Sequence, residues 1–148
     1  MESVERIIAA PPETIFALLA DPSRHRDIDG SSTVRDARMR AERLQLGTRF
    51  AMGMRAGLPY TMVNTVIEFE PDRVIAWQTR AGGFLGRWIG GRIWRYELEA
   101  VPGGTRVRES WDISQEKATS RWAAKRLAAV NRRGMAATLK RIEELVTD

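Results

Sequence analysis

The amino-acid sequence predicts an α+β protein in which an antiparallel β-sheet packs against one long C-terminal helix. Two patterns indicate this class. Between residues 48 and 113, apolar and polar side chains alternate over several segments, which is the period of half-buried strands. From about Glu116 to Val146, apolar residues recur at three- to five-residue steps, which is typical of a helix. Each pattern supplies an apolar face that the other can cover, so we expect both in one structure.

The first elements expected are a strand over Ser3 to Ala10 and a short helix after it. The helix begins at Pro11 to Thr14, because proline suits the first turn and Glu13 lies near the positive end of the helix dipole. Asp21-Pro22 ends it, since the residue before a proline avoids helical geometry. A second short helix is expected over Pro22 to Arg26.

The middle of the chain is predicted to be a sheet of about six to seven strands, counting the first. Strands are expected over Thr48–Arg55, Thr61–Phe69, Arg73–Thr79, Ile93–Val101 and Thr105–Ile113. Short turns join consecutive strands, among them Glu70-Pro71-Asp72 and the glycine-containing Pro102-Gly103-Gly104. Such turns favour an antiparallel meander.

One apolar stripe marks the terminal helix. Its residues are Leu127, Val130, Met135, Leu139, Ile142 and Val146. At 1.5 Å per residue, about thirty helical residues would span roughly 45 Å, so the stripe needs a broad sheet to cover it.

Composition indicates one soluble globular domain over residues 1–148, with 43% hydrophobic and 29% charged residues. The chain has no cysteine, which excludes disulfides, thiol catalysis and thiolate metal sites. Residues 1–5 lack the apolar core of a signal peptide, and no apolar run approaches the ~20 residues of a membrane-spanning helix. We therefore expect a cytoplasmic protein without membrane insertion.

Several motifs point to a known superfamily. Val4 to Pro22 reads Val-x-x-x-x-Ala-Ala-Pro-Pro-Glu-Thr-Ile-Phe-Ala-Leu-Leu-Ala-Asp-Pro. Further motifs are Leu46 to Phe50, Glu68 to Pro71 and Tyr96 to Val107. With the order of elements, they resemble the START-like (SRPBCC) superfamily, and within it the polyketide cyclase/dehydrase and lipid-transport family, over essentially the whole chain.

The resemblance implies a helix-grip fold, in which a curved antiparallel sheet wraps around the last helix and an elongated cavity lies between them. A curved sheet and a single helix cannot pack closely along their full length, so side chains or a ligand must fill the gap. The fold hosts binding proteins, cyclases and ribosome-associated factors alike, so it does not select one chemistry.

Alternation predicts which side chains face that cavity. Phe50 shares a side of its strand with two methionines, while Arg49 and Arg55 lie on the other side, so the Phe/Met side faces inward. The predicted ligand-binding residues are Phe50, Met52, Met54, Ile75, Trp77, Trp94, Tyr96, Leu98, Val107, Trp111 and Met135. Such a lining suits flat or irregular apolar ligands; the alternative is a packed core of the same residues.

Glu109 is the first candidate catalytic residue. It lies on the inward side of its strand, between Val107 and Trp111. A carboxylate in that position either finds a partner or has its pKa raised by desolvation. It could act as a polar anchor, or as a general acid/base on a bound carbonyl compound. The alternatives are a structural ion pair with an arginine, or a β-bulge that turns Glu109 outward.

His25, the only histidine, is the second candidate. It lies in a polar segment with Arg24 and Asp27, which the resemblance places near the cavity mouth. A His25–Asp29 pair could transfer protons; the alternative is an exposed loop histidine. One imidazole among scattered carboxylates lacks the spacing of metal ligands, so we expect no metal and no cofactor.

Residues 81–91 hold five glycines interleaved with large apolar side chains. The segment lacks the Gly-Lys-Ser/Thr ending of a phosphate loop and the glycine spacing of a dinucleotide site. We expect a flexible hairpin whose Phe84, Leu85 and Trp88 open and close the cavity. The alternative is a loop that simply packs on Trp122.

Three functions follow. The favoured one is binding or transport of an apolar small molecule, because no complete catalytic constellation is present. The second is a cofactor-free cyclase or dehydratase in which Glu109 moves protons on a poly-carbonyl substrate. The third is an RNA- or ribosome-associated protein. Its basis is the basic terminal helix, with Lys117, Arg121, Lys125, Arg126, Arg132, Arg133, Lys140 and Arg141.

A nucleic-acid partner is the least favoured of these. The net charge of +5 is mostly due to arginine, a bias that the coding genome can produce, so a solvated basic surface is the favoured explanation. A monomer and a homodimer both remain compatible with the sequence.

Overall fold

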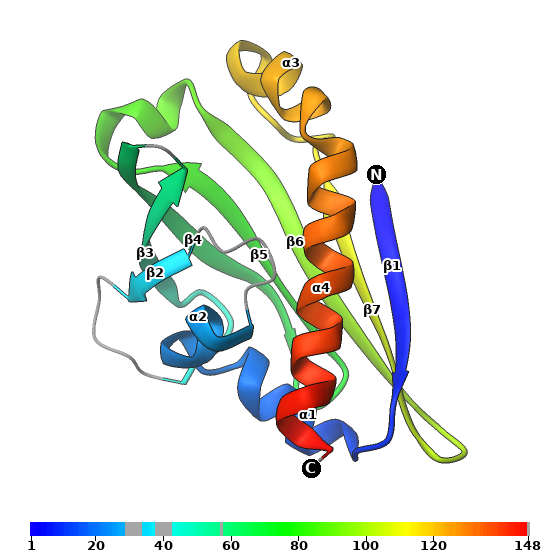
Figure 1. The fold of residues 1–148 in the computed structure, drawn as a ribbon. Helices are drawn as coiled ribbons and strands as arrows, with labels where there is room; N and C mark the ends of the chain where they lie inside the picture. Colours follow the sequence, from blue (N-terminus) through cyan, green and yellow to red (C-terminus); the bar gives the residue numbers. More distant parts are fainter. Residues whose placement is uncertain (29–33, 38–42, 57, 148) are drawn as a thin grey trace.

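Seven antiparallel strands form one sheet that bends around the C-terminal helix α4 (Ala128–Val146) (Figure 1). The computed structural model describes residues 1–28, 34–37, 43–56 and 58–147; for residues 26, 34–37, 52–56 and 58–60 it describes the backbone alone. The strands are β1 (Glu2–Ile8), β2 (Val34–Ala37), β3 (Arg49–Ala56), β4 (Leu58–Glu70), β5 (Val74–Ala81), β6 (Gly90–Val101) and β7 (Gly104–Asp112).

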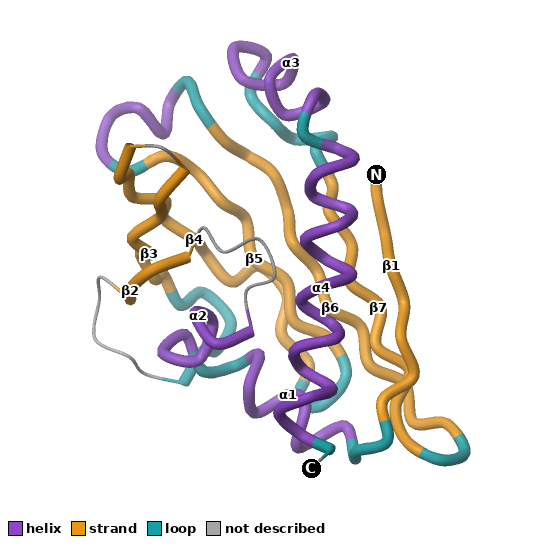
Figure 2. Tube along the Cα trace, in the orientation of Figure 1, coloured by secondary structure: helices purple, strands orange, loops and turns teal. Residues whose placement is uncertain are grey.

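The strand order is β1-β7-β6-β5-β4-β3-β2, and every neighbouring pair is antiparallel. Strands β2 to β7 therefore form the predicted meander, and β1 pairs with β7 (Figure 2). Strand β2 was not predicted. Register shifts between Val66 and Glu68 and between Thr79 and Arg80 interrupt the ladders of β5. Because bulges bend a strand and increase its twist, they account for part of the curvature.

Two short helices follow β1, as predicted: α1 (Pro12–Leu19), and then the 3-10 turn η1 (Pro22–Arg24) continued by α2 (His25–Ile28). Figure 1 shows α1 and α2 on the same side of the sheet as α4. Three of the α1 side chains, Ile15, Phe16 and Leu19, are fully buried in the main hydrophobic cluster. That cluster lies on the concave side of the sheet.

The prediction of one continuous helix from Glu116 to Val146 is wrong. The segment forms α3 (Ala118–Arg126) and α4, which meet at Leu127. The Leu127 N–H bonds to the carbonyl of Ala124, three residues earlier, which is the hydrogen bond of a 3-10 turn. The ψ of Leu127 is 1°, which departs from α-helical geometry. The helix direction therefore changes beyond the upper end of the sheet (Figure 1).

The apolar stripe is correspondingly shorter than predicted. Leu127 and Val130 are exposed, whereas Met135, Leu139 and Ile142 are buried against the sheet. Ion pairs add to this contact at the β1 edge, where Arg6 bonds to Glu143 at 2.9 Å and Glu2 bonds to Arg132. The first strand is thus tied to both ends of α4.

Candidate functional site

The face of the sheet that α4 covers carries a row of aromatic side chains. Pairing places Trp77 opposite Trp94 and Trp94 opposite Trp111, and the rings of the last pair lie 6.1 Å apart. Two residues from these tryptophans on each strand, Tyr96 lies opposite both Ile75 and Glu109. Directly paired residues of an antiparallel ladder point to the same side, so all of these side chains share the concave face.

The structure buries most of the side chains predicted to line a cavity. The buried ones are Phe50, Ile75, Trp77, Tyr96, Leu98, Val107, Trp111 and Met135, and Trp94 is half-buried. The side chains of Met52 and Met54 lie outside the described residues. Their backbone positions pair with Met62 and Tyr60, in register with Phe50.

His25 is buried, and the expectation of an exposed loop histidine is wrong. Helix α2 places its imidazole over the sheet, where it stacks on Trp77 at 5.0 Å and meets Phe50 edge-on at 5.5 Å. Its Nε2 lies 2.9 Å from the carbonyl oxygen of Leu19, and because a carbonyl only accepts, Nε2 carries the proton. The proposed partner Asp29 lies outside the described residues.

Glu109 points inward and is 3% exposed. The expectation of an outward turn at a bulge is wrong, because β7 pairs with β1 and β6 without a register shift at this position. One partner of the carboxylate is Tyr96, whose hydroxyl donates a 2.7 Å hydrogen bond to Oε1. This hydrogen bond holds the two groups in a fixed relative orientation.

Ring contacts connect His25 to Glu109. The His25 imidazole stacks on Trp77, Trp77 contacts Tyr96 at 5.7 Å, and Tyr96 bonds to Glu109. We call these four residues the interior row. It has a polar group at each end and apolar ring faces between them, so it can stack against a flat molecule while hydrogen-bonding to an oxygen on that molecule.

A second polar pair on this face was missed in the sequence. Thr79 donates a 2.5 Å hydrogen bond to Oδ1 of Asn64, and both residues are buried. Asn64 pairs with Phe50 and Thr79 across the ladder, so it continues the concave face beyond Trp77. Its position between Met62 and Val66 in an alternating strand was the available signal.

A buried ion pair lies where β6 begins. Arg92 contacts both carboxylate oxygens of Glu116, at 2.7 and 3.2 Å, and the hydroxyl of Ser120 donates a further bond of 2.6 Å. Burial opposes the charge of Glu116, but the Arg92 pair and the Ser120 hydrogen bond outweigh it and lower the pKa of this carboxyl below its ordinary value of 4.5. The partners are far apart in sequence, so no local pattern indicated them.

The glycine-rich hairpin contains a 3-10 turn, η2 (Gly83–Arg87), and its apolar side chains point to solvent. Phe84 is 73% exposed and Trp88 56%. The alternative expected from sequence, packing on Trp122, can cover only part of that side chain, because Trp122 is 67% exposed. Movement of the hairpin stays a prediction.

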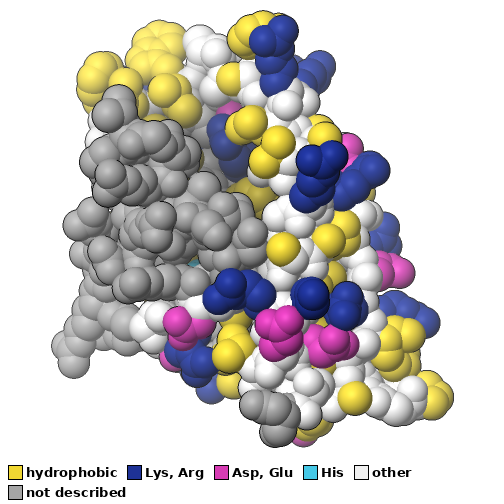
Figure 3. Space-filling view, in the orientation of Figure 1, with side chains coloured by type: hydrophobic (Ala, Val, Ile, Leu, Met, Phe, Trp, Pro, Cys, Tyr) yellow, Lys and Arg dark blue, Asp and Glu magenta, His cyan; other side chains and the backbone are white. Residues whose placement is uncertain are grey.

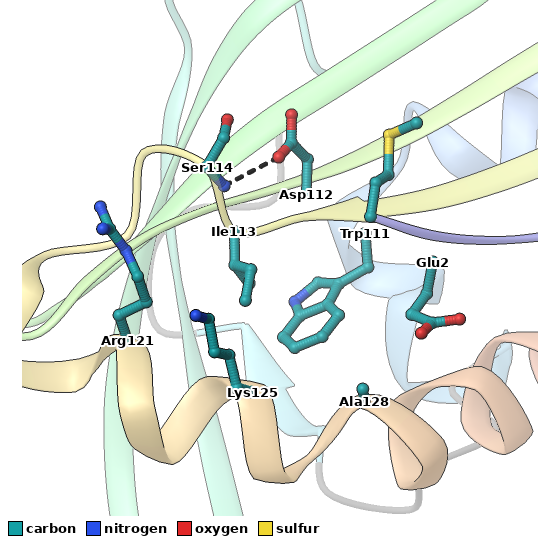
Figure 4. Close-up of a pocket in the computed structure, with 9 residues that line it drawn as sticks. Glu2, Trp111, Asp112, Ile113, Ser114, Arg121, Lys125 and Ala128 are labelled. Carbon is teal, nitrogen blue, oxygen red and sulfur yellow. Dashed lines mark hydrogen bonds between the residues drawn. The ribbon is translucent and has the colours of Figure 1, made fainter.

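A surface pocket of about 440 Å³ opens between the end of β7 and helices α3 and α4. Figure 4 shows the side chains of Trp111, Ile113 and Lys125 directed into the space between these elements. Trp111 ends the Trp77–Trp94–Trp111 series and lines this pocket, whereas Trp77 and Trp94 do not.

Within the described ranges, no three His, Asp or Glu side chains lie close enough together to hold a metal ion. None of the helices described is long and apolar enough to cross a membrane.

Comparison with known proteins gives one family. The family model described as polyketide cyclase / dehydrase and lipid transport matches residues 3–147. The uncharacterized protein Rv0088 of Mycobacterium tuberculosis is 36% identical over 107 residues, which cover 71% of this chain and 44% of that protein. The chain therefore spans less than half the length of the curated relatives it matches.

Solved structures share the fold at low sequence identity. The di-domain ARO/CYC protein StfQ of the steffimycin biosynthetic pathway matches with a TM-score of 0.72 and 12% identity, over 98% of this chain and 49% of StfQ. Protein CV1439 of Chromobacterium violaceum matches with a TM-score of 0.71 and 16% identity, over 99% and 96% of the two chains. Protein MLL2253 of Mesorhizobium loti gives 0.69 and 19%, over 97% and 94%. These neighbours confirm the helix-grip fold and, at such identities, the fold alone.

Proposed function

Because the chain belongs to the polyketide cyclase / dehydrase and lipid transport family, we propose that it binds an apolar or aromatic small molecule between the sheet and α4. The observation that supports this function is the interior row, in which stacked rings connect the His25 imidazole to the Glu109 carboxylate. Binding sites for small molecules are mostly apolar and contain a few fixed polar groups, which is the composition of this row.

The polar end of the row sets the ligand chemistry we expect. Tyr96 and Glu109 are held by their mutual hydrogen bond within apolar surroundings. A ligand hydroxyl can donate to the carboxylate while the Tyr96–Glu109 bond stays intact. A ligand carbonyl can accept the tyrosine O–H only by taking the place of Glu109 Oε1 as its acceptor. An apolar molecule with one oxygen substituent therefore fits this end better than a pure hydrocarbon, because buried polar groups discriminate strongly against ligands that leave them unpaired.

Entry requires side chains to move. His25 covers a face of Trp77, and Phe50 meets both rings edge-on at 5.5 and 5.6 Å. A ligand that stacks on the same face of Trp77 must take the place of the imidazole. Helix α2 has only four residues, but it carries the buried Ile28 of the main hydrophobic cluster, so we expect the His25 side chain to move rather than the whole helix.

The test uses two probes, 1,8-dihydroxyanthraquinone as a flat aromatic and palmitate as a lipid, with native mass spectrometry of the purified protein to detect any co-purifying molecule. The variant Tyr96→Phe removes only the hydroxyl and should weaken anthraquinone binding roughly tenfold, the order of one hydrogen bond. Arg108→Gln, which lies on the outer face, is the matched control and should not change it. Absence of binding by both probes and of any co-purified molecule would exclude the proposed function.

A second candidate, a cyclase or dehydratase, is favoured by one observation: the hydrogen-bonded Tyr96–Glu109 pair can give and take a proton next to apolar ring faces. The neighbour StfQ is titled an ARO/CYC protein. If Glu109 is the acid/base, Glu109→Gln should abolish turnover of a poly-carbonyl substrate while leaving its affinity within a few-fold. Unchanged turnover in this variant would exclude that role.

A further inference from the structure

Exposed apolar side chains gather at one end of the molecule. Phe84 and Trp88 on the η2 hairpin and Trp122 on α3 are each more than half exposed. Further exposed apolar residues at this end are Leu85, Ile89, Leu127 and Val130. In Figure 3, hydrophobic side chains form two groups at the upper end of the view, over η2 and over α3. Exposed patches of this kind mark interaction sites in proteins.

The two groups belong to one continuous surface. The Lys117 N–H donates to the carbonyl of Gly90 at 2.7 Å, and the Gly90 N–H donates to the Ser120 hydroxyl at 3.2 Å. Thr119 donates a hydrogen bond to the carbonyl oxygen of Trp88. The η2 hairpin is therefore fastened to the start of α3, so the two apolar groups lie at the same end of the molecule. We call residues 80–92 and 117–133 the basic aromatic end.

This end is also strongly and uniformly positive. It contains nine of the 24 lysines and arginines and none of the 19 acidic residues, so the rest of the chain carries a net charge of −4 against +5 for the whole. Arg92 and Arg132 form ion pairs with residues outside it. The basic residues without an ion pair within the described ranges are Arg80, Arg87, Lys117, Arg121, Lys125, Arg126 and Arg133.

Tryptophan and positive charge occur here side by side. The guanidinium of Arg126 lies 4.2 Å from the centre of the Trp122 ring, and Arg87 precedes Trp88 in the chain. Indole rings favour the head-group layer of a bilayer, where an apolar body and a polar edge are both satisfied. Basic residues are attracted to anionic lipids at the same depth.

We propose that the basic aromatic end docks on the surface of a bilayer containing anionic phospholipid, with Trp88 and Trp122 at the level of the head groups. A second copy of the chain is a poorer occupant, because a two-fold contact would bring like charges together. A nucleic acid would match the charge, but would leave the apolar tip formed by Phe84, Leu85 and Ile89 without a partner. This inference goes beyond the proposed function and does not depend on it.

The experiment is flotation of the full chain with vesicles of phosphatidylcholine alone and of phosphatidylcholine mixed equally with phosphatidylglycerol. We expect binding to the mixed vesicles only, and its loss when salt screens the charges. Of the five tryptophans, only Trp88 and Trp122 are exposed, so binding should also shift the tryptophan emission to shorter wavelength.

Two variants test the two components of the surface. Trp88→Ala/Trp122→Ala should abolish the emission shift and most of the binding. Lys125→Gln/Arg126→Gln should lower the partition coefficient roughly thirtyfold, as expected for two basic residues near an anionic surface. Circular dichroism checks that both variants are folded.

The matched controls are Ile7→Ala/Ile67→Ala, which removes exposed apolar side chains from other parts of the sheet, and Arg108→Gln/Lys140→Gln, which removes the same charge elsewhere. Both should bind as the parent does. Equal binding to neutral vesicles, or unchanged binding by the tryptophan variant, would overturn the proposal. So would an RNA gel shift without vesicle binding, or a dimer that the tryptophan variant converts to monomer.

Discussion

The buried Arg92–Glu116 pair allows a stability prediction with a defined sign and size. Replacing Arg92 by methionine keeps the bulk of the side chain but leaves the carboxylate of Glu116, fully buried, with Ser120 as its remaining side-chain donor. Removing one partner of a buried pair costs about 3–5 kcal/mol. Because the Arg92 side chain is 18% exposed and water reaches it, we expect the lower end, about 3 kcal/mol.

The loss should depend on pH. In the parent, the pKa of Glu116 is lowered, so the stabilisation is present above the ordinary value of 4.5 and is lost as pH falls through the lower folded pKa. In Arg92→Met, burial still opposes the charge of Glu116, but only Ser120 remains to offset it, so the pKa of Glu116 should rise. The variant should therefore be less stable than the parent only at a pH where Glu116 is charged. The difference between the two proteins is therefore largest near neutral pH and shrinks on acidification.

Urea unfolding followed by circular dichroism measures this difference at neutral pH and below 4.5. Arg95→Met is the matched control, since the Arg95–Glu68 pair is 2.7 Å long but 42% exposed on both sides, and exposed pairs are worth about 0–1 kcal/mol. The double variant Arg92→Met/Glu116→Met should regain most of the loss. A loss at Arg92 no larger than at Arg95, or one that is independent of pH, would refute the reasoning.

Three further predictions concern packing, and urea unfolding measures each. Met135→Ala should lower the free energy of unfolding by about 2–5 kcal/mol, because this side chain is buried against Trp111. Leu127→Ala, at an exposed position, should lower it by under about 1 kcal/mol. Equal losses would contradict the observation that the buried stripe begins after Leu127. Gly91→Ala should be strongly destabilising, since the φ of Gly91 is +112° and a Cβ there would clash with the carbonyl oxygen of Gln115. A neutral result would rule out this close approach. Asn64→Val leaves the buried Thr79 hydroxyl without its acceptor and should lower the free energy of unfolding by about 1–3 kcal/mol. The double variant Asn64→Val/Thr79→Val should restore part of this loss. Additive losses would argue against the Thr79–Asn64 hydrogen bond.

The sequence predicted the concave face well where the ladder is regular. Strands β6 and β7 pair without a shift through their whole hairpin, so simple alternation placed Trp94, Tyr96 and Glu109 on the correct side. The fold class and the meander were confirmed for the same reason, since short turns between consecutive strands leave few alternatives. The resemblance supplied the curvature and the helix-grip arrangement, which alternation cannot give.

The features that were predicted wrongly or missed all depend on tertiary contacts. No glycine or proline marks the turn at Leu127, where the helix breaks beyond the end of the sheet. His25 stands among charged residues, which suggested exposure, but α2 rotates it onto Trp77. The Arg92–Glu116 pair joins segments that meet only in the folded chain. Local patterns report local geometry, and none of these features is local.

The pairing of β1 with β7 constrains how the chain can be synthesised. Glu2 pairs with Trp111, and Arg6 bonds to Glu143 of α4, so β1 waits for partners that are synthesised more than a hundred residues later. Until β7 and α4 are available, β1 has no partner strand and the apolar face of the meander is uncovered, and both conditions favour aggregation. A fusion partner or chaperone that shields the emerging chain should therefore raise the yield of this protein more than any change within the finished sheet.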